Sequence, residues 1–228
     1  MGLCYETGFG TNVNKEKAFE LYQKAADLGN ANGMNSLGYC YENGVGTDVD
    51  IKKALELYRK AANLENYYAQ FNLALLGYCY DIGIGTEVNK QKAFELYQKA
   101  ADLGNSHGIN NLGWCFECGY GTIINEQMAF ELYQKAADLG NINGMNSLGC
   151  CYKNGVGTDV DNHKAFELYQ KAAYLGNDFS QYNLALMYEY GSDTEKDINQ
   201  AIYWYKKSAE QGHGYAHEKL AELLEKLN

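Results

Sequence analysis

The sequence predicts an all-α fold, a solenoid of repeated helices, and three observations support this prediction. One phrase, KAFELYQKAADLGN, begins at Lys17, returns at Lys92, and returns from Met128 with one letter changed. The six copies are spaced by 36, 39, 36, 36 and 36 residues, measured between their first alanines: Ala18, Ala54, Ala93, Ala129, Ala165 and Ala201. Proline is absent from all 228 residues, which suits helices and tight turns. We therefore expect residues 1–228 to form a single solenoid of about six repeats.

Each copy of the phrase is predicted to be the second helix of a repeat, because its apolar residues recur at helical spacing. In the first copy these residues are Ala18, Leu21, Tyr22, Ala25, Ala26 and Leu28. Four residues before each first alanine stands a side chain that can cap the helix: Asn14, Asp50, Asn89, Asn125, Asp161 and Asp197. Glycines that suit a left-handed helix end follow five of the copies, at Gly29, Gly104, Gly140, Gly176 and Gly212, with Glu65 in the other.

The first helix of each repeat is predicted from the spacing Leu-Gly-x-x-Tyr, as in Leu37, Gly38 and Tyr41. The glycine lets a neighbouring helix approach closely, and Ala74 and Ala185 replace it in two copies. A Gly-x-Gly turn then joins the two helices, as at Gly44 and Gly46. The 39-residue step comes from three extra residues around 75–77, nearly one helical turn, so the first helix there is expected to be longer.

These motifs, taken together, resemble the Sel-1-like repeat, a relative of the tetratricopeptide repeat. The pattern A-x-x-[NS]-L-[GA]-x-x-Y-x-x-G-x-G, followed by D-x-x-K-A-x-x-[LW]-Y-x-K-A-A-x-x-G, covers essentially the whole chain. The resemblance implies a right-handed α/α superhelix of antiparallel helix pairs, with the first helices lining the concave side. It also implies a protein-binding adaptor or scaffold, as in signalling, membrane-protein quality control and bacterial effectors. Some members of the family are attached to kinase or other catalytic domains.

The cysteines differ from those of the secreted bacterial branch of that family, in which two cysteines eight residues apart staple each repeat. Those places here hold pairs such as Ala26 and Met34. Five cysteines instead occupy one position of successive first helices: Cys4, Cys40, Cys79, Cys115 and Cys151. Helices stack about 8–10 Å apart, which is too far for a disulfide between repeats. We expect reduced, half-buried thiols and a cytoplasmic, reducing location.

If the first helices line a groove, four positions counted from the signature leucine should face it. The side chains one and two before the leucine are Asn35, Ser36, Phe71, Asn72, Asn110, Asn111, Asn146, Ser147, Tyr182 and Asn183. The side chains two after it include Tyr39, Tyr78 and Trp114, and those five after it include Glu42, Asp81, Glu117 and Glu189, with Lys153 as the exception. Amides can pair with a peptide backbone, aromatic rings anchor it, and acids favour a basic ligand. The alternative is that these polar rows are merely solvated.

Other classes of function find little support in the sequence. The net charge of −10 argues against nucleic acid or an anionic membrane as partner, and no apolar run approaches the roughly 18 residues of a membrane span. No recurring set of side chains suggests catalysis or a metal site, so we expect no enzyme activity and no cofactor.

The two ends of the repeat array are predicted to differ. The segment 216–228 reads as an amphipathic capping helix with Leu220, Leu223, Leu224 and Leu227 on its apolar side. At the start, Met1-Gly2 aligns with Leu37-Gly38, so the first repeat is incomplete and could allow end-to-end self-association. Two alternatives to a scaffold follow: a regulatory repeat segment of a larger signalling enzyme such as a kinase, or a self-assembling structural element.

Overall fold

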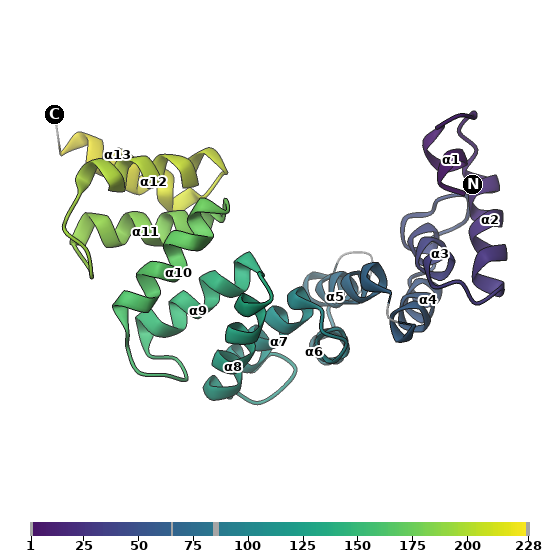
Figure 1. Ribbon diagram of the computed structural model, residues 1–228, viewed down its shortest axis with the longest axis horizontal. Coiled ribbons are helices and arrows are strands. Elements are labelled where there is room, and N and C mark those ends of the chain that lie inside the picture. Colours follow the sequence, from purple (N-terminus) through teal and green to yellow (C-terminus); the bar gives the residue numbers. More distant parts are fainter. Residues whose placement is uncertain (1, 65, 84–86, 227–228) are drawn as a thin grey trace. The chain divides into compact units, whose positions relative to one another are not determined.

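A computed structural model of the chain describes residues 2–64, 66–83 and 87–226; the side chains of Tyr67, Gln70, Phe71 and Cys79 also lie outside the description. Over these residues the fold is all-α, as predicted, with thirteen helices and no strand (Figure 1). The helices are α1 (Gly2–Thr7), α2 (Lys15–Asp27), α3 (Ala31–Asn43), α4 (Ile51–Asn63), α5 (Tyr67–Ile82), α6 (Lys90–Asp102), α7 (Ser106–Cys118), α8 (Glu126–Asp138), α9 (Ile142–Asn154), α10 (Asn162–Tyr174), α11 (Asp178–Tyr190), α12 (Ile198–Glu210) and α13 (Gly214–Glu225).

The even-numbered helices from α2 to α12, which we call helices B, carry the recurring phrase. All six predicted N-caps are confirmed, because each cap oxygen accepts the backbone N–H three residues later. Asn14, for example, accepts from Lys17 at 2.8 Å. Each such cap is worth about 1 kcal/mol of helix stability. At the other end, Gly29, Gly104, Gly140, Gly176 and Gly212 all have the predicted positive φ, between +78° and +94°.

The odd-numbered helices, which we call helices A, pack against helices B through glycine and tyrosine. A Cβ atom on Gly113 of α7 would lie 2.9 Å from the ring of Tyr133 on α8, which is 1% exposed. The same glycine–tyrosine contact recurs at Gly38 with Tyr58 and at Gly149 with Tyr169. A buried tyrosine ring therefore fills the space beside each of these glycines, and this explains why the Leu-Gly-x-x-Tyr spacing has glycine at that position.

The Gly-x-Gly turns connect consecutive repeats as well as two helices. Gly46 has φ +67°, and a Cβ atom there would lie 2.3 Å from the carbonyl oxygen of Lys15. Gly157 makes the same close approach to the carbonyl of Glu126. Only glycine allows the turn of one repeat to lie against the first turn of helix B in the repeat before it.

Helix α5 is longer than the other complete helices A, as the 39-residue step predicts: it has 16 residues, whereas α3 has 13. Because three residues are nearly one turn, Leu73 and Leu76 are both fully buried. Gly77, rather than Ala74, faces the ring of Tyr97 in the position that Gly38 occupies against Tyr58. Ala74 was therefore the wrong equivalent of the signature glycine for that contact.

Residue contacts divide the chain into two compact units. Unit 1 comprises residues 1–112 and 120–122, and unit 2 comprises residues 113–119 and 123–228. Within unit 2, α11, α12 and α13 pack side by side (Figure 1). Leu223 of α13 is buried in their shared core, Leu220 packs beside it, and Leu224 is 45% exposed; Leu227 lies outside the described residues. That all six repeats form one domain stays a prediction.

Candidate functional site

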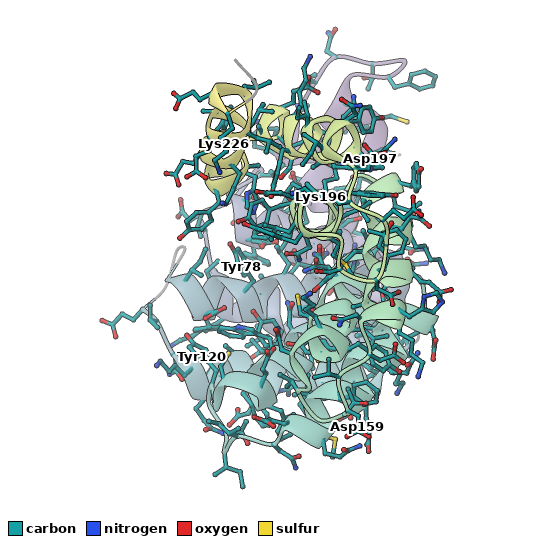
Figure 2. The ribbon with its side chains drawn as sticks, turned by 90° about the vertical axis from the view of Figure 1, so that its left-hand side faces the viewer. Tyr78, Tyr120, Asp159, Lys196, Asp197 and Lys226 are labelled. Carbon is teal, nitrogen blue, oxygen red and sulfur yellow. The ribbon has the colours of Figure 1, made fainter. Side chains whose placement is uncertain are left out.

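The position two residues after the signature leucine presents apolar and aromatic side chains at the surface of helices A. Tyr39 on α3 and Tyr78 on α5 are each 45% exposed, and Leu3 on α1 is more exposed still (Tyr78 is labelled in Figure 2). The later members are more covered: Trp114 and Cys150 pack against the cores of unit 2, as does Leu186. We call the surface formed by these residues and the other predicted groove positions the helix-A face.

The acidic position five residues after the leucine has a partner within its own repeat. The hydroxyl of Tyr58 on α4 donates to the carboxylate of Glu42 at 2.5 Å, and Tyr133 donates to Glu117 at 2.5 Å. Tyr22 with Glu6 and Tyr205 with Glu189 repeat the arrangement at 2.6 Å, and Glu189 is itself buried. These carboxylates therefore hold the two helices of a repeat together, a role that the sequence reasoning missed.

The electrostatics of these pairs favour the hydroxyl as donor. Burial, followed by the hydrogen bond to the neighbouring carboxylate, raises the pKa of Tyr58, Tyr133 and Tyr205 well above the ordinary value for tyrosine. Each hydroxyl thus keeps its proton, and the carboxylate accepts it as a hydrogen bond. A fixed spacing of sixteen residues between acid and tyrosine was the available signal in the sequence.

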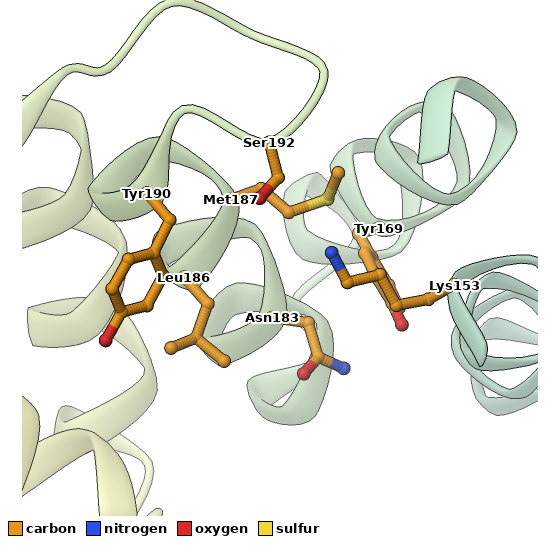
Figure 3. A pocket seen from close by; sticks show the side chains of 7 residues that line it. All are labelled: Lys153, Tyr169, Asn183, Leu186, Met187, Tyr190 and Ser192. Atoms are coloured by element: carbon orange, nitrogen blue, oxygen red, sulfur yellow. The ribbon is translucent and has the colours of Figure 1, made fainter. Parts of the chain in front are cut away.

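The fifth repeat breaks this pattern. Lys153 stands where the other repeats have an acid, and the hydroxyl of Tyr169 instead donates to the sulfur of Cys150 at 3.3 Å. Figure 3 shows the Lys153 side chain extending from α9, its amine pointing into a space bordered by Met187 and Asn183 of α11. This space is a cavity of 170 Å³, also lined by Tyr169 and residues of α11 and the loop that follows it.

The predicted asparagine rows are joined to one another between repeats. The amide nitrogen of Asn72 donates to Asn35 at 2.9 Å, and that of Asn183 donates to Asn146 at 3.2 Å. Asn146 accepts a second hydrogen bond, from Ser180 at 2.9 Å. These amides align consecutive helices A, so part of their hydrogen-bonding capacity is already used within the protein.

A second set of asparagine bridges lies at the starts of helices A. Their N-cap side chains donate to the residue two after the preceding N-cap: Asn66 to Asn32 at 2.7 Å and Asn177 to Asn143 at 3.0 Å. Asn110 donates to its neighbour Asn111 at 3.2 Å. Ser36 and Ser147 are half-buried, and the side chain of Phe71 lies outside the description.

Cavities open between consecutive helices A in both units. In unit 1, a cavity of 180 Å³ is lined by the predicted residues Tyr78 and Asn111, together with Ala74, Leu75 and His107. In unit 2, the cavity beside Lys153 includes the predicted residue Asn183. A third cavity, of 470 Å³, lies between α11 and α13. Tyr78, Asn111 and Asn183 are predicted groove residues, whereas no predicted groove residue lines the third cavity.

None of the described cysteines is in a disulfide. Cys40, Cys115 and Cys151 are at most 1% exposed, so they are more buried than the half-buried thiols that we expected. Cys4 is half-buried. Burial, followed by the nearby Glu6, raises the pKa of Cys40 to about 11, and burial with Glu117 raises that of Cys151 to about 12. Thiols in these surroundings stay protonated and fill core space.

None of the helices in the described part of the chain combines the length and the hydropathy that a bilayer-spanning helix needs.

Comparisons with known proteins find the same repeat. The sequence model of a family described as Sel1 repeat matches residues 1–30, 31–66, 68–105, 106–141, 142–177 and 178–213. Among curated proteins, none matches the chain.

Solved structures are similar to the chain over most of its length. One is a protective antigen present in uropathogenic Escherichia coli strains and displaying an SLR fold, with 32% identity and a TM-score of 0.83. The match covers 97% of this chain and 47% of the antigen, so the chain spans about half of that structure. Another is a Sel1 repeat protein from Oxalobacter formigenes, with 29% identity, a TM-score of 0.72, and coverage of 91% and 82% respectively.

Proposed function

Because this chain belongs to the Sel1 repeat family, we propose that it is a protein–protein interaction scaffold that binds a peptide or partner protein on its helix-A face. Sel1 repeat proteins are generally scaffolds of this kind, and they are generally not enzymes. The proposal adds the binding face, which the family alone does not supply.

The observation that carries the proposal is the position of the cavities. Tyr78 and Asn111 line a cavity between α5 and α7, and Asn183 lines another between α9 and α11. Exposed rings beside a cavity supply large contact areas, which is how anchoring residues at interfaces work. Tyr39 and Tyr78, at 45% exposure, are free to make that contact.

The asparagine, aromatic and acidic positions of the helix-A face differ in how much of each side chain is available to a partner. The bridging amides of Asn35, Asn72, Asn146 and Asn183 are partly occupied, so the aromatic row is the main anchor. A preference for a basic partner rests on the net charge of −10, because Glu42, Glu117 and Glu189 of the helix-A face already accept hydrogen bonds from buried tyrosines.

We also propose that the protein works in a reducing compartment such as the cytoplasm. The support is the set of buried thiols at Cys40, Cys115 and Cys151, which serve as small apolar core residues.

The experiment that tests the binding face starts from a peptide selected against the whole chain from a random displayed library. Its affinity is then measured by calorimetry for the chain carrying Tyr39→Ala and Tyr78→Ala. We expect binding at least about tenfold weaker, because aromatic anchors commonly contribute more than 1.4 kcal/mol, with little change in melting temperature.

The matched control carries Tyr174→Ala and Tyr203→Ala, which remove rings of 72% and 50% exposure from helices B. The control should bind the peptide as the unmodified chain does. Equal affinity of the unmodified chain and the Tyr39/Tyr78 variant would overturn the assignment of this face.

A further inference from the structure

The largest of the three cavities, 470 Å³, lies at the junction of α11 and α13 and combines aromatic rings with acids. Phe179, His213 and Tyr215 supply the rings, and Asp178 and Glu218 supply the carboxyl groups. Phe179 is 56% exposed and Tyr215 is 69% exposed, so both rings are open to a ligand.

The rings are held by a buried histidine rather than lying loosely on the surface. His213 is 8% exposed; its ring centroid lies 5.0 Å from that of Phe179, edge to face, and 6.2 Å from that of Tyr215. Tyr182 also stacks on the histidine, with the ring centroids 4.8 Å apart. The aromatic wall is therefore pre-organised by packing around His213.

This junction departs from the earlier ones in residue type. At two earlier junctions the N-cap asparagine of one helix A donates to the asparagine two after the preceding N-cap: Asn66 to Asn32 and Asn177 to Asn143. Here the N-cap is His213, and the position two after Asn177 is Phe179. An aromatic contact thus replaces an amide bridge and leaves ring surface uncovered.

The histidine of the cavity also caps helix α13. Its Nδ1 accepts the backbone N–H of Ala216 at 3.3 Å, which is the N-cap bond of α13. An accepting Nδ1 carries no proton, so this capping bond uses the neutral form of the ring. Lys219, which follows Glu218 in the sequence, donates to Glu222 at 3.1 Å. The carboxylates of Asp178 and Glu218 therefore set the sign of the cavity's charge.

Part of the cavity is lined by glycines, which have no side chain. Gly212 and Gly214 line it, and a Cβ atom at either glycine would meet nothing within 4 Å. The cavity is therefore open on the side of these two glycines.

We propose that this cavity binds an arginine side chain of a partner protein. A guanidinium group is planar, stacks on aromatic faces and pairs with carboxylates through a fixed fork of N–H donors. Phe179 and Tyr215 offer the faces, and Asp178 and Glu218 offer the acceptors. The proposal rests on the scaffold function for the source of the arginine, and the cavity adjoins the helix-A face through Tyr182.

The test is an NMR titration of the whole ¹⁵N-labelled chain with the capped tripeptide acetyl-Gly-Arg-Gly-amide. The amide signals of Gly212 and Gly214 report on the cavity. We expect saturable shifts of both signals. The same tripeptide with neutral citrulline in place of arginine should bind at least about tenfold more weakly, because it keeps the shape and loses the charge. Equal shifts with both tripeptides, or no saturable shift with the arginine tripeptide at tens of millimolar, would overturn the proposal.

Two variants locate the binding. Tyr215→Ala removes one exposed ring and Glu218→Gln removes one charge; each should weaken binding several-fold. Tyr203→Ala on α12 and Glu225→Gln on α13 are matched controls outside the cavity and should bind normally. If Tyr215→Ala impairs folding, the conservative Glu218→Gln still decides the outcome. Unchanged affinity in Glu218→Gln would contradict the role of the carboxylate.

Binding of the tripeptide is read at the amides of Gly212 and Gly214, whereas binding of the selected peptide is read through Tyr39 and Tyr78. Failure of one experiment is therefore separable from failure of the other.

Discussion

The hydroxyl of Tyr133 donates a 2.5 Å hydrogen bond to the carboxylate of Glu117, sixteen residues earlier in the chain. The ring lies at 1% exposure under Gly113, one turn of α7 before that carboxylate. One tyrosine thus fills the space left by a glycine and also satisfies an acid on the same helix. The contact recurs in most repeats and joins helix A to helix B by a hydrogen bond.

The first prediction concerns the contribution of that hydrogen bond to stability. Tyr133→Phe should lower the free energy of unfolding by about 1–2 kcal/mol, because it leaves the Glu117 carboxylate without its donor. Tyr169→Phe is the matched control: its hydroxyl meets only a thiol sulfur, a weak acceptor, so the loss should be about 0.5 kcal/mol or less. Urea titration followed by circular dichroism gives both values. Equal losses would show that the carboxylate contributes nothing.

The second prediction concerns a variant that restores the acid–tyrosine hydrogen bond in the fifth repeat. Lys153→Glu places a carboxylate sixteen residues before Tyr169, in the relation that Glu117 has to Tyr133. We expect a gain of about 1 kcal/mol in the free energy of unfolding near neutral pH. The gain should vanish when Tyr169→Phe is also present, since the two side chains would then be coupled. A gain that survives in the double variant would point to simple removal of the lysine charge.

The third prediction concerns thiol reactivity. Cys118 is exposed, whereas Cys40 and Cys151 are buried and their pKa values are raised to about 11 and about 12. Since the thiolate is the reacting species, iodoacetamide near pH 8 should label Cys118 at least about tenfold faster than the two buried thiols. Peptide mapping by mass spectrometry measures the rates. In concentrated urea the three rates should converge, and a native rate at Cys40 equal to that at Cys118 would contradict its burial.

The fourth prediction is a pH dependence at an exposed histidine. Nδ1 of His163 lies 2.8 Å from the Asp193 carboxylate, and that contact, followed by the charge of Asp193 and then of Glu167, raises the pKa of His163. A raised pKa means that the folded state favours the charged form. This stabilisation is fully present below about pH 6.5, the ordinary value, and is lost as the pH rises through the folded-state value.

His163→Gln should therefore lower the urea midpoint at about pH 5.5 and leave it nearly unchanged at about pH 9. Salt should reduce the difference, because the pair is exposed. A difference of equal size at both pH values would mean that His163 acts through packing and not through its charge.

Local features of the helices were predictable because they depend on neighbours in the sequence. The N-cap oxygens of Asn14 and Asp161 act three residues away, and the left-handed glycines such as Gly29 end the helix that precedes them. The lengthening of α5 was predictable for the same reason, since three added residues make nearly one turn.

The candidate site was predictable only in part. The prediction that helices A line a groove included Tyr78, Asn111 and Asn183, which do line cavities. It also included Tyr39 as an aromatic residue of the helix-A face. It did not separate Glu42 and Glu117, which bond buried tyrosines, from solvent-facing acids. The rings of Phe179 and Tyr215 were not named, because neither belongs to the positions counted around the signature leucine.

The sequence by itself determined that this protein is a chain of regularly spaced helix pairs, since period, caps and turn glycines are local and repeat. Tertiary structure decided which polar side chains of that repeat already have hydrogen-bond partners within the protein. Whether Glu117 faces a ligand or Tyr133, and whether Asn183 faces a peptide or Asn146, depends on helices that pack across the repeat. The physical reason is that a polar side chain near a packed interface bonds the nearest available partner, and the identity of that partner is set by three-dimensional packing.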